Sequence, residues 1–181
     1  MPFNLFSNDM SESEVNDKIN EITEIQVKAE SNARFFFIIF WIIAVIYLFV
    51  SAFIGMRGNM NFGDWVYQLA TSKTVFGLAV FASASTLFVM YSFALQFKIY
   101  CLEHYNDYAT QSDLIRNEHK AVSHSKIGLA MITAAVLGYG ITTLFNASFL
   151  DLCRTIICAL FVVGCFVFAR SSLIRSGFDK I

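Results

Sequence analysis

Residues 35–56 read FFFIIFWIIAVIYLFVSAFIGM and contain no charged side chain. A helix needs roughly 20 apolar residues to cross the hydrocarbon core of a bilayer, which is about 30 Å thick. Segments 74–97 and 127–150 are similarly long and free of charge, and 155–169 spans the core if Arg154 and Arg170 extend to the two interfaces. The sequence therefore predicts four membrane-spanning segments, with the lipid bilayer as the first partner.

The apolar residues occur in blocks rather than at amphipathic spacing, a pattern typical of helices that face lipid. The chain of 181 residues contains a single proline, Pro2. This favours helices over a closed β-barrel, the other structure that satisfies the backbone in a bilayer. We predict an all-α fold, a four-transmembrane-helix bundle.

Lys and Arg are distributed unevenly about these segments. Three precede the first span, four lie in 98–126 and three follow the fourth span, while the other loops hold only Arg57, Lys73 and Arg154. The positive-inside rule then places both termini and the middle loop in the cytoplasm, as in a bacterial inner-membrane protein. The predicted parts are a cytoplasmic N-terminal helix (1–33), spans at 34–56, 74–97 and 127–150, an external loop (57–73), a cytoplasmic helical loop (98–126), an external turn with the fourth span (151–169) and a cytoplasmic tail (170–181).

The N-terminal segment predicts an amphipathic helix. Ser11 and Glu14 form a capping box, which marks a helix start. An apolar stripe with a period near 3.6 follows, formed by Val15, Ile19, Ile22, Ile25, Ala29 and Ala33. A coiled-coil seam would instead need an apolar residue at Gln26. The stripe packs either on the protein's own middle loop or on another subunit or soluble cytoplasmic partner, and Ser11–Met56 forms one rod.

Two loops contain further helical signals. In 57–73, Asp64 is a candidate cap for a short helix, and Trp65 and Tyr67 suit a membrane interface. A re-entrant pore helix is the alternative there. The middle loop contains neither Pro nor Gly, so we expect the second and third spans to continue past the membrane as helices that turn near 110–113.

Every charged residue lies at or beyond the end of a predicted span, which argues against coupled transport and voltage sensing. The third span instead carries small residues at four-residue spacing, namely Ala130, Ala134, Gly138 and Thr142. Such residues either pack helices closely or line a pore between several copies, with Phe rings as a hydrophobic gate. The candidates for these two roles are Gly77, Ser85, Phe88, Ser92, Gly138, Tyr139, Thr142 and Asn146.

We find no motif for catalysis, for a cofactor or for a metal, so we predict none of these. The three histidines and four cysteines lack the spacing of metal ligands. A basic surface for nucleic acid is also missing. A small anionic ligand remains a hypothesis, with a site formed by Arg116, Lys120, Lys126, Arg175 and Lys180.

These features favour a homo-oligomeric membrane channel or membrane-disrupting effector, opened through its cytoplasmic helices. In layout alone the chain is similar to small multi-pass effectors of bacterial anti-phage defence, without a shared residue motif. The alternative is a non-conducting scaffold or sensor that recruits a soluble cytoplasmic partner. A small carrier or an intramembrane enzyme is disfavoured because the spans lack ionisable residues.

Overall fold

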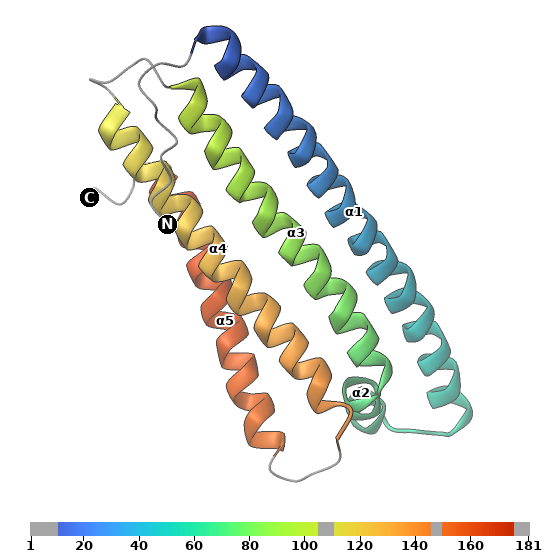
Figure 1. Ribbon diagram of the computed structural model, residues 1–181. Coiled ribbons are helices and arrows are strands. Elements are labelled where there is room, and N and C mark those ends of the chain that lie inside the picture. Colours follow the sequence, from blue (N-terminus) through green and yellow to red (C-terminus); the bar gives the residue numbers. More distant parts are fainter. Residues whose placement is uncertain (1–10, 105–110, 146–149, 176–181) are drawn as a thin grey trace.

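The computed structural model describes residues 11–104, 111–145 and 150–175 (Figure 1). It contains five helices: α1 (Glu12–Arg57), α2 (Phe62–Thr71), α3 (Thr74–Glu103), α4 (Gln111–Thr142) and α5 (Leu150–Arg175). These ranges contain no strand. Helices α1, α3, α4 and α5 are each long and apolar enough to cross a membrane. The predicted all-α class is thus confirmed, and so are four helices of the length and apolarity that a membrane span requires.

Helix α1 begins where the sequence predicts. The Ser11 hydroxyl accepts the N–H of Glu14 at 3.4 Å, and the Glu14 carboxylate accepts the N–H of Ser11 at 3.0 Å. The helix then continues unbroken for 46 residues to Arg57. At a rise of 1.5 Å per residue this is a rod of about 70 Å. The capping box and the single rod are both confirmed.

The four long helices form an open row in the order α1, α3, α4, α5 (Figure 1). Helix α3 packs between α1 and α4, and α4 packs between α3 and α5. Within the described ranges the α1 backbone approaches neither α4 nor α5. Side chains of α3 and α5 also come near each other, since the ring centroids of Phe93 and Phe168 lie 6.3 Å apart.

In a closed four-helix bundle the first and last helices would also meet, whereas this row leaves α1 and α5 apart. In water, such closure is driven by removal of apolar faces from the solvent. Lipid tails are as apolar as the helix surface, so closure in a bilayer brings no such gain. The large apolar side chains of α1 and α5 accordingly stay exposed over most of each helix, including Phe49 and Phe166.

The apolar segment 127–150 is not helical throughout. Helix α4 ends at Thr142, and α5 begins at Leu150, before the predicted start of the fourth span. The hydroxyls of Thr142 and Thr143 donate to the carbonyl oxygens of Tyr139 and Gly140, at 2.7 and 2.6 Å. Such bonds give the backbone local partners and are common where a helix ends.

Helix α2 lies steeply inclined to the long helices, since Figure 1 views it almost along its axis while the long helices run across the picture. The short helix itself was predicted, but its cap was not. Asn61 is the N-cap, and its side-chain oxygen accepts the N–H of Asp64 at 2.8 Å. Asp64 instead lies in the first turn of α2, where the positive end of the helix dipole stabilises its carboxylate.

Candidate functional site

The seam between α1 and α3 contains a polar cluster. The buried Ser85 hydroxyl donates to the carbonyl oxygen of Ala33 at 3.0 Å. Farther along α3, the buried Ser92 hydroxyl donates to Oε1 of Glu30 at 3.2 Å. The Gln26 amide donates to the same carboxylate oxygen at 3.1 Å. Two of the pore or packing candidates, Ser85 and Ser92, therefore use their hydroxyls to bind α1 within the protomer.

Aromatic rings continue the same seam. The Phe88 ring stacks on Phe36 of α1, with centroids 5.6 Å apart and planes 12° apart. The Phe81 ring lies 6.3 Å from Phe36. Phe88, the candidate for a hydrophobic gate, is thus placed between two helices of one protomer. Stacked rings of this kind add to the stability of a helix pair.

Glu30 is a functional candidate that the sequence analysis missed. It lies outside the first apolar segment, yet it bonds Ser92, which lies inside the second. The two helices are offset along their axes. Ala33, just before the first apolar segment, contacts Ser85 in the middle of the second. The polar part of α1 therefore packs along apolar residues of α3. Hydropathy read one segment at a time does not reveal the register between helices. A carboxylate thus lies beside the second predicted span, with Arg34 Nη2 4.0 Å from Glu30 Oε2.

The N-terminal stripe follows a different line from the predicted one. Val15, Ile19 and Ile22 are half-buried, but Ile25 is 37% exposed. Gln26 is half-buried in its place. The contact with α3 therefore passes through Gln26, in alternating steps of four and three residues from Val15 to Ala33. Contact of Ile25 with another subunit or a soluble partner stays a prediction. A glutamine is tolerated at this position because its amide finds an acceptor, the carboxylate of the next turn.

The seam between α3 and α4 combines hydroxyls with close backbone approach. Ser83 donates to the carbonyl oxygen of Thr133 at 3.4 Å, and the hydroxyls of Thr86 and Thr133 bond each other. Near the other end of the seam, a Cβ added at Gly140 would lie 2.5 Å from the Cβ of Ala79. Small residues are therefore required where these two helices cross.

Between α4 and α5 the two backbones themselves come close together. A Cβ added at Gly128 would lie 2.6 Å from the Phe168 nitrogen and 2.8 Å from the Gly164 carbonyl oxygen. Toward the other end, Arg154 donates from Nε to the Thr142 hydroxyl at 3.3 Å and from Nη2 to the Thr142 carbonyl at 3.4 Å. Thr142, a further pore or packing candidate, is buried in this contact.

The remaining pore or packing candidates that the structure describes make looser contacts with neighbouring helices. A Cβ added at Gly77 would meet no atom within 4 Å, and one at Gly138 would meet Ile157 at 3.5 Å. Tyr139 is half-buried, and Asn146 lies outside the described residues. The structure thus groups some candidates at the α1–α3 seam and others near the end of α4, and it does not join the two groups.

The proposed anionic-ligand residues do not form one face of α4. Arg116 and Lys120 are exposed and one turn apart. Lys126 is half-buried, and its position six residues beyond Lys120 turns it about 240° around the helix. The Arg175 side chain and Lys180 lie outside the described part of the chain.

The histidines lie in separate local contacts. The His119 ring lies 5.2 Å from Phe97, and the His104 ring lies 4.3 Å from Tyr100. Nδ1 of His124 bonds the carbonyl of the preceding turn at 2.8 Å. Over the described ranges, no three His, Cys, Asp or Glu residues come together as a metal site would require.

Cys101 is buried at the end of α3 beyond the predicted span. Burial, and then the nearby carboxylate of Glu118, raise the pKa of its thiol. A thiol with a raised pKa carries little thiolate near neutral pH and is a weak nucleophile. The chemistry of this cysteine is therefore that of a packing residue.

Comparison with known proteins gives no relative from which a role can be transferred. No protein-family model, curated protein or solved structure matches this chain. Function is therefore inferred from the chemistry and geometry of the residues themselves.

Proposed function

We propose that this protein is a homo-oligomeric integral membrane protein that forms a pore-type assembly between its copies. The observation that carries the proposal is the open row of long helices, which encloses no path across a membrane in the described residues. The hydroxyls of Ser85, Ser92 and Thr142 are engaged in seams within the protomer. A conducting path then requires several copies that share a closed symmetry.

The face of α4 that carries Ala130 and Ala134 supports this self-association. Both alanines are exposed, and they share this face with the exposed Ile127 and Ile141. Several other alanines of the row are buried where two of its helices meet, namely Ala29, Ala33, Ala79 and Ala135. Small residues let two helix backbones approach closely in lipid. We place the α4 helix of a second copy on this face.

Liposome reconstitution tests the proposal. Ala134→Leu adds bulk at the α4 face, where overpacking costs about 1–3 kcal/mol and lowers the association constant by about 5- to 150-fold. We expect less oligomer and less ion flux or dye release. Ala159→Leu is the matched control, because Ala159 is also exposed but lies on α5. Equal oligomer and equal flux in wild type and Ala134→Leu would contradict the proposal.

A second function, a non-conducting scaffold, is favoured by the acidic face of α1. Asp17, Glu21 and Glu24 are exposed at spacings of four and three residues, so they share one side of the helix. A basic soluble partner would fit this side. Capture of such a partner that is abolished by Glu21→Lys with Glu24→Lys, with no flux in any condition, would favour the scaffold over the pore.

A further inference from the structure

Helices α1 and α2 meet in a tight elbow at one end of the row. The N–H of Gly58 donates to the Ile54 carbonyl at 3.0 Å, and the N–H of Met60 donates to the Gly55 carbonyl at 3.2 Å. Asn59 has a φ of 48°, a left-handed conformation that asparagine tolerates better than most residues. Backbone bonds therefore hold the elbow in one shape.

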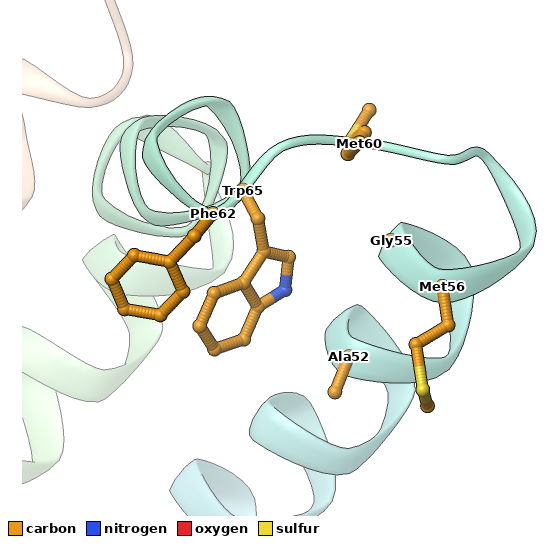
Figure 2. A pocket seen from close by; sticks show the side chains of 6 residues that line it. All are labelled: Ala52, Gly55, Met56, Met60, Phe62 and Trp65. Atoms are coloured by element: carbon orange, nitrogen blue, oxygen red, sulfur yellow. The ribbon is translucent and has the colours of Figure 1, made fainter.

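A pocket of about 280 Å³ lies inside this elbow, lined by Ala52, Gly55, Met56, Met60, Phe62 and Trp65. Figure 2 shows Trp65 near the start of α2 turned toward the last turns of α1, which carry Ala52, Gly55 and Met56, with the Phe62 ring beside Trp65. The rim is apolar and open, because Met56 is 72% exposed and Phe62 is 77% exposed. The pocket thus opens at the end of α1, beside the end of the first predicted span.

The indole N–H of Trp65 lacks an acceptor. The ring lies against Gly55 so closely that an added Cβ there would come within 2.9 Å of Trp65 Cδ1. Nε1 is buried and bonds no atom of the described residues. A second hollow of about 150 Å³ is also lined by Trp65, together with the polar residues Ser51, Gln68 and Ser72. A buried indole N–H normally finds a partner, so an acceptor oxygen is the group that this elbow lacks.

Positive charges lie on both sides of the elbow. Arg57 is exposed directly after Met56, and its guanidinium carbon lies 4.5 Å from the centroid of the Phe53 ring. Lys73 is exposed at the start of α3, next to Ser72 of the second hollow. A phosphate would be attracted to these side chains at a membrane surface.

From these features we infer that the elbow binds an anionic phospholipid. One acyl chain enters the pocket beside Met56 and Phe62, an ester carbonyl oxygen accepts the N–H of Trp65, and the phosphate lies against Arg57. The volume is near the lower end of the ~300–1,000 Å³ of small-molecule pockets, so it holds part of one chain. The inference is independent of the proposed oligomer, since one protomer supplies every residue.

Quenching of Trp65 fluorescence tests this site in the full-length chain. The chain has two tryptophans, so Trp41→Phe leaves Trp65 as the only indole. The protein is placed in phosphatidylcholine nanodiscs with equal fractions of brominated-chain phosphatidylglycerol or brominated-chain phosphatidylcholine. We expect at least twofold stronger quenching by the phosphatidylglycerol. Arg57→Gln should remove this preference, because it removes the charge that attracts the phosphate.

Gly55→Ala tests the pocket itself, and we expect it to reduce quenching by both lipids because the added methyl group displaces the Trp65 ring. Gly63→Ala is the matched control, since its Cβ would meet only Asn61 Oδ1 at 3.5 Å. Circular dichroism establishes that each variant keeps its helices. Equal quenching by the two lipids in the Trp41→Phe protein would overturn the inference. So would a preference that survives Arg57→Gln.

Discussion

The crossing of α4 and α5 at Gly128 makes the sharpest prediction about stability. In Gly128→Ala the new methyl carbon would lie 2.6 Å from the Phe168 nitrogen, 2.8 Å from Phe168 Cα and 2.8 Å from the Gly164 carbonyl oxygen. All three are backbone atoms, so no side chain can rotate away. Helix α5 itself has to move.

The size of the effect follows from these distances. Ordinary contact begins near 3.4 Å, so the nearest backbone atom has to retreat by about 0.8 Å. A gap of roughly that size forfeits a quarter to a half of the van der Waals attraction of the atoms it separates. Overpacking in a tight interface typically costs about 1–3 kcal/mol, which exceeds the roughly 0.5–1 kcal/mol that alanine gains over glycine within a helix.

Steric trapping in bicelles measures the free energy of unfolding directly. We expect Gly128→Ala to lower it by about 1–2 kcal/mol after the gain in helix propensity is included. Gly77→Ala provides the control, because an added Cβ there meets no atom within 4 Å. It should leave the free energy unchanged or slightly raised. A Gly128→Ala protein as stable as Gly77→Ala would refute the α4–α5 packing described here.

Two further predictions concern single side chains. Ser85→Ala removes the hydrogen bond to the Ala33 carbonyl and should lower the free energy of unfolding by about 0.6 kcal/mol, with an upper bound near 1.7. Ser51→Ala is the control and should cost less, because the Ser51 hydroxyl bonds a carbonyl of its own helix. Equal losses in the two variants would count against the α1–α3 seam. Burial and Glu118 raise the pKa of the Cys101 thiol above its ordinary value of 9.0, so the rate of maleimide alkylation of Cys101 as the sole cysteine should reach half its maximum above pH 9.0. Glu118→Gln should shift that midpoint to lower pH, and a wild-type midpoint at or below 9.0 would contradict this environment.

Local signals in the sequence were sufficient for much of the fold. The capping box at Ser11 predicted the start of α1, because both of its hydrogen bonds join residues only three apart. The apolar blocks predicted four spans because the thickness of a bilayer fixes the length of helix that crosses it. Neither inference required knowledge of which helices are neighbours.

The arrangement of the helices depends on contacts between distant residues, and the sequence did not predict it. The seam passes through Gln26 rather than Ile25 because Glu30 supplies an acceptor one turn away. Glu30 itself contacts Ser92, a partner 62 residues distant. The row stays open because lipid covers apolar edges at no cost, so hydrophobicity alone does not determine the partners of a spanning helix.

The elbow between α1 and α2 depends both on a local signal that the sequence reveals and on a contact that it does not. Trp65 was identified from the sequence as an interfacial aromatic residue, which is its local property. Its pocket depends on Gly55 of another helix, where only the absence of a side chain leaves room for the ring. No pattern of spacing connects these two positions, because the connection passes through the turn at Gly58 and Asn59.

The central claim is that several copies of this row assemble in one membrane. The mass of the purified particle in nanodiscs, measured by native mass spectrometry, tests it most directly. We predict a discrete multiple of the 20.4 kDa protomer that dissociates in Ala134→Leu and persists in Ala159→Leu. A single protomer mass for the wild-type protein at every concentration would contradict the claim.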